Sequence, residues 1–276
     1  MTARDMGEHG YIHGTAPKEQ ARLTNLNRIL NEGSLRELAP RSGERVLDVG
    51  AGLGQMARAI ARRTGMAVVA VERSPQQIAE AARQAGEVGE EALLDLRQGD
   101  AFDLPLRPDE WGTFDIAHTR FLLEHVSNPV AIVRGMVRAV RPKGRIVLED
   151  DDHELLRLWP EAPRVMTVWR AYMQTYSAAD HDPLIGRKLP ELLYQAGALP
   201  RRMTYVFFGE CAGSPDFRAY VDNLAEIIEG ARTALLEVGL PAEQIAAGLD
   251  ELGSWAERPD AAFWYAMSWA EGVRPG

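Results

Sequence analysis

The chain has 276 residues, of which 46% are hydrophobic and 26% charged, so it can hold one large α/β domain with additions or two small ones. The net charge is −9, so the chain lacks the excess of basic residues that nucleic-acid-binding proteins carry. Nucleic acid is therefore not an expected partner. The polar N-terminal residues, the lack of a long apolar run and the single Cys211 predict a cytoplasmic protein without a secretion signal, a membrane span, a disulfide framework or a Cys-cluster metal site.

The chain is predicted to begin with an amphipathic helical segment over 17–39 and to continue with alternating strands and helices. The expected strands are 45–49, 67–72, 93–98, 113–118 and 144–150. The expected helices between them are 53–64, 75–86 and 129–140. Alternation with short loops implies a parallel, doubly wound α/β sheet.

The C-terminal part is predicted to complete the sheet and to add helices. The expected helices are 156–179, 188–197 and 215–253, and the expected strands are 201–208 and 262–270. Ligands bind at the carboxyl ends of the strands in an open parallel sheet. If the strands before them are parallel, segments 151–187 and 209–260 both start at that edge, and we expect them to form a substrate lid. A homodimer contact is the alternative role for these helices.

The most informative motif is VLDVGAGLG, residues 46–54, which joins a strand to a helix. Gly50, Gly52 and Gly54 stand at alternate positions, and an apolar helical pattern follows at once. Glycines let the backbone bend sharply and approach a ligand, and a helix N-terminus offers free N–H groups. This order of features is typical of a nucleotide-cofactor site.

Two classes of cofactor fit these glycines. Gly52-x-Gly54-x-x-Ala57 matches the relaxed dinucleotide fingerprint, and Glu72 ends the next strand, so an NAD(P)-dependent oxidoreductase is one interpretation. Asp48 argues against it, because a carboxylate repels a pyrophosphate but attracts a cofactor with an amino group and a sulfonium. A Tyr-x-x-x-Lys proton relay is also lacking. A capping or turn role is the alternative for Asp48, and a non-catalytic cofactor-binding protein is a further alternative for the chain.

The same motif resembles the first motif of class I S-adenosylmethionine-dependent methyltransferases, of the small-molecule (ubiquinone/menaquinone-methyltransferase-like) type. Further motifs resemble those of the family in the expected order: 67–74, 97–106, 114–126, 141–150 and, more weakly, 11–23. The resemblance implies a Rossmann-like, mostly parallel seven-stranded sheet with helical lid insertions. It also implies an enzyme that transfers a methyl group from S-adenosylmethionine to a hydroxyl or amine of a small molecule.

The resemblance further implies a domain plan and a set of cofactor contacts. Residues 1–40 would be a helical segment that closes over the cofactor, 41–150 the cofactor-binding core, and 151–276 the rest of the sheet with the lid. Asp48 and the glycines would hold the methionine part, Glu72 the ribose and Asp100 the adenine. The expected cofactor-binding residues are Asp48, Gly50, Gly52, Gly54, Glu72, Arg73, Asp100, Ala101 and Arg120. Arg120 has two alternative roles to cofactor binding: it could bind an anionic substrate or pair with Glu124.

His125 is the expected catalytic residue. It lies just past the fourth predicted strand, where related small-molecule methyltransferases often carry a histidine that faces the methyl donor. It would act as a general base toward a hydroxyl acceptor, and a helix-capping or core role is the alternative. His118 is the last residue of the fourth predicted strand, and a structural role is at least as well supported for it as a functional one.

Asp150, Asp152 and Tyr172 are the expected substrate contacts. Alternation places Asp150 and Asp152 on one side of the chain, where they could attract an amine or activate a hydroxyl. Consecutive carboxylates could hold Mg²⁺, but without a second ligand cluster no metal is expected, and a loop or cap role is the alternative. Tyr172 shares a helical face with Trp169 and Tyr176, and such a stripe forms either a pocket wall or the core.

Overall fold

A computed structural model describes residues 30–276 and divides them into two compact units. In the part described, the core unit consists of residues 30–152, 184–206 and 267–276, and the helical unit of residues 153–183 and 207–266. The motif expected at 11–23 and the first part of the expected helix 17–39 lie outside the described residues. Residues 30–38 are helical, as predicted.

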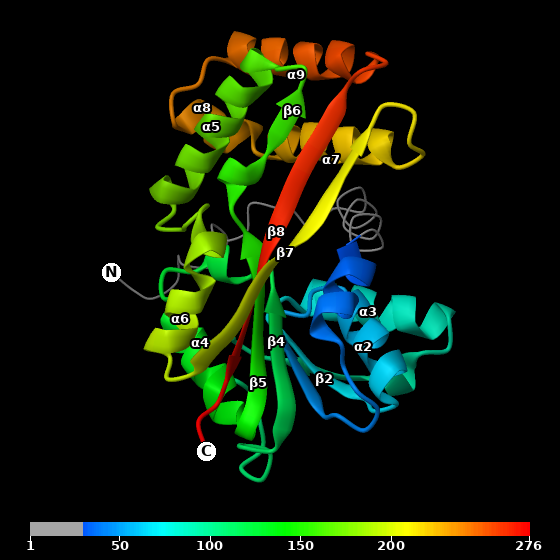
Figure 1. Cartoon of the computed structure of the whole chain (residues 1–276), viewed down its shortest axis with the longest axis vertical. Helices are drawn as coiled ribbons and strands as arrows, with labels where there is room; N and C mark the ends of the chain where they lie inside the picture. Colours follow the sequence, from blue (N-terminus) through cyan, green and yellow to red (C-terminus); the bar gives the residue numbers. More distant parts are fainter. Residues whose placement is uncertain (1–29) are drawn as a thin grey trace. The chain divides into compact units, whose positions relative to one another are not determined.

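The core unit is built on a parallel sheet with the predicted alternation of strands and helices. Its first strands are β1 (Val46–Val49), β2 (Val68–Glu72), β3 (Leu94–Gln98), β4 (Phe114–Arg120) and β5 (Val140–Asp151). Its helices are α2 (Gln55–Thr64), α3 (Pro75–Glu87), η1 (Glu91–Leu93), η2 (Leu123–His125), α4 (Pro129–Ala139), η4 (Ile185–Lys188) and α6 (Leu189–Gln195). The strands pair in the order β3-β2-β1-β4-β5, all parallel (Figure 1). The predicted doubly wound topology is therefore confirmed.

The two faces of this sheet differ in chemistry. Leu47 and Val49 point to the face on which α4 and α6 complete the hydrophobic core. Asp48 lies between them in β1 and therefore points to the opposite face. His118 pairs directly with Asp48, and Glu149 pairs with Arg120 two residues further along, so their side chains share that face. Charged groups thus gather on the face away from α4 and α6.

Two long strands extend the sheet beyond β5. β8 (Ala262–Val273) pairs antiparallel with β5, and β7 (Leu199–Cys211) pairs with β8. The short strand β6 (Arg157–Trp159) pairs antiparallel with the first part of β8. Within residues 30–276 the sheet therefore has eight strands rather than the predicted seven, and β6 is the one that the sequence did not predict.

The helical unit contains the helices α5 (Pro163–Ala178), α7 (Phe217–Gly230), α8 (Arg232–Glu237) and α9 (Ala242–Ala256). The helix predicted over 156–179 is wrong in its first turns, which form β6. Proline explains the late start, because Pro163 lacks an N–H group and is tolerated only in the first turn of a helix. The stretch predicted as helical over 215–253 is divided, since Gly239 (φ 90°) and Pro241 stop α8 before α9 begins. None of the helices within residues 30–276 is both long and apolar enough to cross a membrane.

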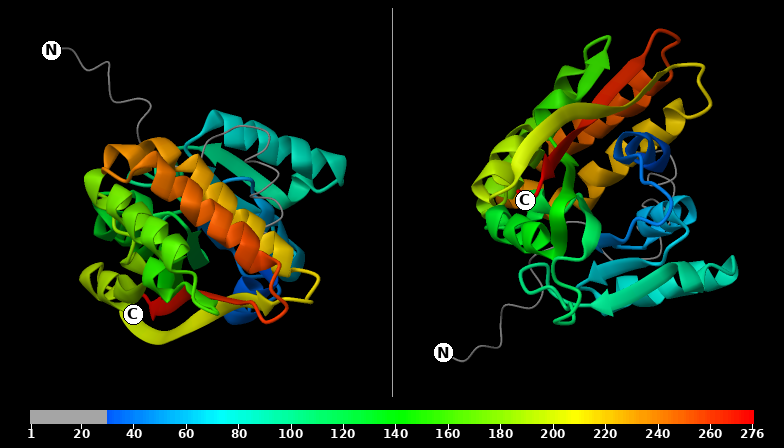
Figure 2. Two further views of the ribbon diagram at one scale, coloured as in Figure 1. Left: turned by 90° about the horizontal axis from the view of Figure 1, so that it is seen from above. Right: turned by 60° about the horizontal axis from the view of Figure 1, so that its bottom comes forward.

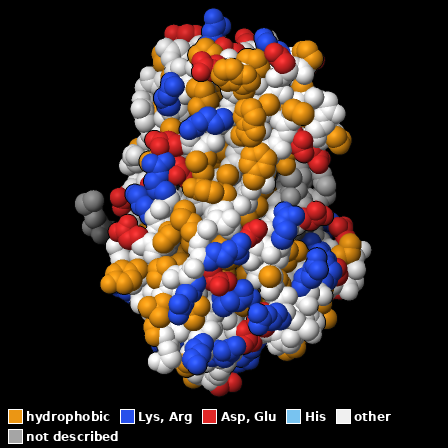
Figure 3. All heavy atoms as spheres, viewed as in Figure 1, with side chains coloured by type: hydrophobic (Ala, Val, Ile, Leu, Met, Phe, Trp, Pro, Cys, Tyr) orange, Lys and Arg blue, Asp and Glu red, His pale blue; other side chains and the backbone are white. Residues whose placement is uncertain are grey.

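The strands of the helical unit carry aromatic side chains on both faces. Phe263 is buried and stacks on Tyr220 of α7 at 5.6 Å between ring centroids. The next residue, Trp264, is 42% exposed, and Trp159 and Phe207 on the neighbouring strands are each 59% exposed. Figure 2 shows the helices of this unit on one side of its strands, and Figure 3 shows hydrophobic side chains gathered over the other side. The open face of an antiparallel sheet is ordinarily polar, so this face is unusual.

Candidate functional site

The glycine turn between β1 and α2 has the backbone geometry that its sequence predicts. Gly50, Gly52 and Gly54 have φ angles of 75°, 53° and 64°, in the left-handed region that other residues avoid. The N–H of Gly50 donates to the carbonyl of Val71 at 2.9 Å, which ties the turn to the end of β2. A Cβ added at Gly52 would lie only 3.1 Å from Gln77 Oε1, so the turn needs glycine for space as well as for conformation.

Glu72 ends β2 beside this turn and organises its backbone. One carboxylate oxygen accepts the Gly52 N–H at 3.0 Å, and the other accepts the Ser74 N–H at 2.8 Å. The Ser74 hydroxyl in turn accepts the N–H of Gln77 and caps α3. Glu72 is therefore held at the carboxyl end of β2, as predicted, while the neighbouring Arg73 is exposed.

Asp100 and Ala101 follow β3, the next strand outward in the sheet. Asp100 is exposed, and its carboxylate accepts the Phe102 N–H at 2.9 Å, which shapes the loop. Ala101 is half-buried against the hydrophobic core. The predicted adenine-side residues thus lie at the same edge of the sheet as Glu72 and the glycine turn.

These groups fit the chemistry of S-adenosylmethionine. Asp48, Glu72 and Asp100 end or follow three neighbouring strands, and ionised carboxylates accept hydrogen bonds from an ammonium group, ribose hydroxyls or an adenine amino group. Asp48, which immediately precedes the turn, would repel the phosphates of a dinucleotide. The glycine turn leaves its backbone open to close approach by the ligand.

A buried charge network adjoins this turn. The His118 Nδ1 atom lies 2.8 Å from Asp48 Oδ1, and its Nε2 atom lies 3.1 Å from Glu149 Oε1. All three side chains are at most 4% exposed. Burial alone would lower the pKa of His118, but the charges and hydrogen bonds of Asp48 and Glu149 outweigh it and raise the pKa from 6.5 to about 9.

The network continues from Glu149 to the helical residues 30–38. The Ser34 hydroxyl donates to Glu149 Oε2 at 2.5 Å, and the Arg120 guanidinium donates to Ser34 Oγ at 3.3 Å and to Asn31 Oδ1 at 2.9 Å. Burial opposes ionisation of Glu149, yet His118, Arg120 and Ser34 together lower its pKa. Arg120 thus lies at the predicted sheet edge and contacts the N-terminal helical segment.

Asp150 contacts the backbone of the loop that follows β4 and that contains His125. Asp150, fully buried at the end of β5, accepts the Leu123 N–H at 2.7 Å and so anchors η2, the short helix that contains His125. The His125 Nε2 atom lies 3.3 Å from a Glu124 carboxylate oxygen. Burial, with the nearby charge of Glu124, raises the pKa of Asp150 well above its usual range.

The other two predicted substrate residues are engaged inside the protein. Asp152 accepts two hydrogen bonds from the Arg187 guanidinium, at 2.7 and 2.8 Å. In the helical unit, Tyr172 is 1% exposed, and its hydroxyl lies 2.9 Å from that of Tyr176. Both rings pack against His153, that of Tyr172 edge-on with centroids 5.5 Å apart and that of Tyr176 tilted with centroids 5.1 Å apart. This burial favours the core alternative for the Tyr172 stripe.

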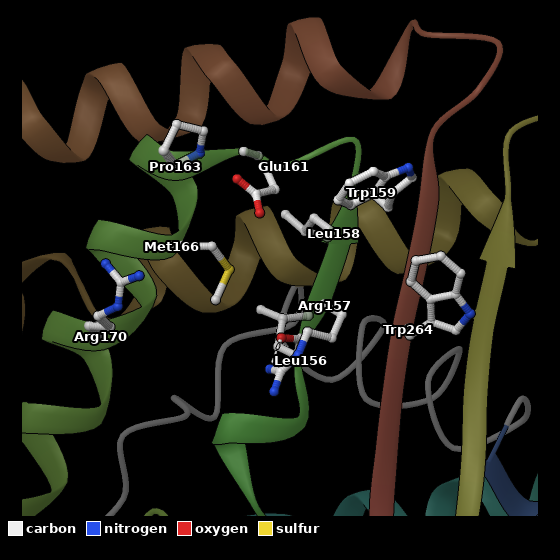
Figure 4. A pocket seen from close by; sticks show the side chains of 10 residues that line it. Leu156, Arg157, Leu158, Trp159, Glu161, Pro163, Met166, Arg170 and Trp264 are labelled. Atoms are coloured by element: carbon white, nitrogen blue, oxygen red, sulfur yellow. Dashed lines mark hydrogen bonds between the residues drawn. The ribbon is translucent and has the colours of Figure 1, made fainter.

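The helical unit also contains a hollow of about 640 Å³ between β6 and α5. Trp159 and Trp264 form one wall, and Met166 and Arg170 of α5 line it from the opposite side (Figure 4). None of the predicted site residues lines this hollow.

Sequence reasoning missed three members of the buried network: Ser34, Asn31 and, as a partner of His118, Glu149. The burial of Glu149 could have been predicted from the sequence. It lies two residues after the apolar Val147 in a predicted strand, so both side chains are on the same buried face, and a buried carboxylate needs a partner. Ser34 and Asn31 carried none, since they lie more than 80 residues from the side chains they contact.

Comparisons with known proteins agree with this geometry. Residues 47–148 match the methyltransferase domain family. The chain is 29% identical over 138 residues to 27-O-demethylrifamycin SV methyltransferase of Amycolatopsis mediterranei (strain S699), which covers 50% of each chain. It is 35% identical over 107 residues to ubiquinone biosynthesis O-methyltransferase of Xanthomonas oryzae pv. oryzae (strain PXO99A), covering 39% of this chain and 43% of the relative. The chain spans about half the length of the curated relatives it matches.

The fold is shared with a solved structure over almost the whole chain. Geranyl diphosphate C-methyltransferase from Streptomyces coelicolor A3(2), solved with Mg²⁺, geranyl diphosphate and S-adenosyl-L-homocysteine, superposes with a TM-score of 0.55. The alignment covers 98% of this chain and 86% of that structure at 14% identity, so the likeness concerns the fold alone. The match to the family model lies within the core unit, where the glycine turn is found. The chain therefore contains, over residues 47–148, a methyltransferase domain that includes the glycine turn, Glu72 and Asp100.

Proposed function

We propose that this protein is an enzyme that transfers the methyl group of S-adenosylmethionine to a hydroxyl or amine of a small molecule. The observation that carries the proposal is the glycine turn of a methyltransferase domain with Asp48 and Glu72 beside it. Two of the relatives, which act in rifamycin and ubiquinone chemistry by their names, are small-molecule methyltransferases. The net charge of −9 supports a small acceptor rather than nucleic acid.

When bound, S-adenosylmethionine supplies a methyl group on a positively charged sulfur. In this proposal Asp48, Gly50, Gly52 and Gly54 hold its methionine part. Glu72 and Arg73 hold the ribose side, Asp100 and Ala101 the adenine, and Arg120 closes the site from β4. Because methyl transfer is an in-line displacement, much of the catalysis comes from holding the acceptor in line and excluding water.

A hydroxyl acceptor also needs a residue that removes its proton, and we propose His125 for this role. Its support is the position of η2 directly after β4, with the loop held by the Asp150 carboxylate. Asp150 and Asp152 are proposed to lie on the acceptor side of the site, without a metal ion. Asp150 is fully buried and both its carboxylate oxygens accept backbone N–H groups, which supports a positioning role in preference to direct metal binding.

We also propose that the protein self-associates as a homodimer through the open sheet face of the helical unit. The exposed aromatic side chains of Trp159, Phe207 and Trp264 support this, since large apolar groups on one face of a sheet mark an interaction surface. Light scattering of the wild type and of Trp264→Glu would test it. A monomeric wild type would refute the dimer.

A methyl-transfer screen tests the proposed activity. S-adenosylmethionine with a labelled methyl group would be offered with hydroxylated, amine and quinone-like acceptors, and transfer should be seen to at least one class. A thermal-shift comparison with NAD(P) separates the oxidoreductase alternative, because only a ligand that binds the folded state raises the melting temperature. Binding of S-adenosylmethionine without transfer to any acceptor would favour a non-catalytic role.

A further inference from the structure

Both ring nitrogens of His118 face carboxylate oxygens, one from Asp48 on β1 and one from Glu149 on β5. A neutral imidazole has a single N–H and could donate to only one of them, so its other nitrogen would present a lone pair to a carboxylate. An imidazolium donates to both. The arrangement therefore requires either a positively charged His118 or a neutral His118 beside a protonated carboxyl group.

The surrounding groups stabilise the charged arrangement. Glu149 receives a second hydrogen bond from Ser34, which favours its ionised form. The charged groups that face the network are Asp48 on β1, Arg120 on β4, and Glu149 and Asp151 on β5. Without a cation between them, Asp48 and Glu149 would be two like charges in a fully buried place. The raised pKa of His118, about 9, is consistent with an imidazolium at neutral pH.

His118 also fixes which oxygen of Asp48 is available. Oδ1 of Asp48 is engaged by His118. From the residues that the structure describes, the other oxygen, Oδ2, accepts no hydrogen bond, although the carboxylate is only 3% exposed. Asp48 immediately precedes Val49 and the glycine turn, so this oxygen is beside the proposed site of the methionine part.

We propose that His118 is a positioning residue for the cofactor: as a buried imidazolium between Asp48 and Glu149, it orients Asp48 so that Oδ2 receives the amino group of S-adenosylmethionine. This inference rests on the proposed function of the glycine turn. It assigns His118 an effect on the amino-acid end of the cofactor and none on its adenosine end. The two ends can be measured separately.

The test compares two ligands in the wild type and in His118→Gln. Calorimetry would measure the affinity for S-adenosylmethionine and for methylthioadenosine, which has the adenosine but lacks the amino-acid part. We expect His118→Gln to weaken S-adenosylmethionine about tenfold and to change methylthioadenosine by less than twofold. The glutamine carboxamide is neutral and carries its donors on one nitrogen, whereas an imidazolium is charged and donates from two. Equal weakening of both ligands would indicate a merely structural role and overturn the proposal, as would unchanged affinity for both.

A double-mutant cycle tests whether His118 acts through Asp48. His118→Gln should weaken S-adenosylmethionine about tenfold when Asp48 is present, but by less than twofold in the Asp48→Asn background, where the residue that it orients no longer carries a charge. Additive losses would overturn the proposal. If the wild type binds neither ligand, the cofactor assignment itself fails. If it binds both and His118→Gln leaves both affinities unchanged, only the role of His118 fails.

The charge of His118 can be read directly in the full-length protein. Nitrogen NMR of ¹⁵N-histidine-labelled protein should show the His118 ring as imidazolium at pH 7, with its titration near pH 9, and Glu149→Gln should lower that midpoint by removing one negative charge. A neutral His118 ring at pH 7 would overturn the proposal. This measurement needs no His118 variant, so it holds even where His118→Gln fails to fold.

Discussion

The N–H of Gly52 donates to the Glu72 carboxylate at 3.0 Å, so the acid that ends β2 is bonded to the middle of the glycine turn. A single side chain therefore links two neighbouring strand ends. Its other oxygen caps the backbone at Ser74, and both bonds shape the loop ahead of α3. The residue proposed to hold the ribose also shapes the turn proposed to hold the methionine part.

Glu72→Ala should therefore abolish measurable binding of S-adenosylmethionine. Each charge-assisted hydrogen bond contributes roughly 1.5 to 3 kcal/mol. The loss of the two bonds proposed between Glu72 and the ribose hydroxyls therefore predicts an affinity at least about 100-fold weaker. Calorimetry measures this, with circular dichroism to confirm the fold. Glu87→Ala, at the exposed end of α3, removes the same charge and should leave the affinity unchanged. Wild-type affinity in Glu72→Ala would contradict the cofactor assignment.

Gly52→Ala should weaken the cofactor and destabilise the protein. Its φ of 53° is strained for alanine, and the new methyl would lie 3.1 Å from Gln77 Oε1, which predicts a cost of about 1 to 2 kcal/mol. Gly253→Ala is the matched control, because Gly253 lies in α9 with no atom within 4 Å of an added Cβ. There alanine should be neutral or slightly stabilising. Thermal unfolding of the two variants in parallel would check both statements, and a fully stable Gly52→Ala would show that the turn tolerates a side chain.

The core of the fold was predictable because local pattern and packing agree there. In β1 the alternation places Leu47 and Val49 in the core and Asp48 on the opposite face, and the glycines that follow have the positive φ angles that the motif requires. The helical unit was less predictable. In β6, Leu158 is buried between two exposed residues, which is the alternation of a strand. Three residues are too few, however, for this alternation to be distinguished in the sequence from the start of a helix.

The site was predictable only where its residues belong to strand ends. Asp48, Glu72 and Asp100 could be placed from the strand pattern, because parallel strands bring their carboxyl ends to one edge. The contact between Ser34 and Glu149 spans 115 residues and depends on how the helical residues 30–38 pack, which no local pattern encodes. The partners of His118 likewise became visible only with the register of β4 against β1 and β5.

His125→Asn tests the proposed general base. Turnover of a hydroxyl acceptor should fall by about 100-fold or more, while the affinity for S-adenosylmethionine should stay within twofold, because all the proposed cofactor contacts except Arg120 lie on β1 and β2 or in the loops after β1, β2 and β3. Steady-state kinetics and calorimetry separate the two quantities. His181→Gln, in the helical unit, controls for the loss of an imidazole. Undiminished turnover in His125→Asn would remove His125 from the mechanism.

Glu110→Gln should destabilise the core unit without affecting cofactor binding. The Glu110 side chain is 1% exposed and pairs with Arg45 at 2.8 Å, Arg97 at 2.6 Å and Arg107 at 2.9 Å. Removing its charge takes a shared carboxylate from three arginines, of which Arg97 is the most buried, and the expected loss is roughly 3 kcal/mol in denaturant unfolding. Asp109→Asn, at an 81% exposed side chain, is the control and should have little effect.

The same carboxylate predicts the acid side of the stability profile. The hydrogen bond from Arg97 is the main cause that lowers the pKa of Glu110 from 4.5 to about 2. A lowered pKa means that the stabilisation is complete above pH 4.5 and is lost as the pH falls toward 2. The free energies of unfolding of wild type and Glu110→Gln should therefore converge in that range. A constant difference down to pH 2 would contradict the assigned pairing.

Tyr172→Phe distinguishes the two roles considered for this tyrosine. Its hydroxyl bonds to that of Tyr176 at 2.9 Å inside the aromatic cluster around His153, so its removal should cost about 1 kcal/mol in the free energy of unfolding. Because the side chain is 1% exposed, we expect KM and kcat for any acceptor found in the screen to stay within twofold. Tyr194→Phe is the control, since Tyr194 is 72% exposed and should change neither quantity. A KM raised tenfold with normal stability would instead show that Tyr172 contacts the acceptor.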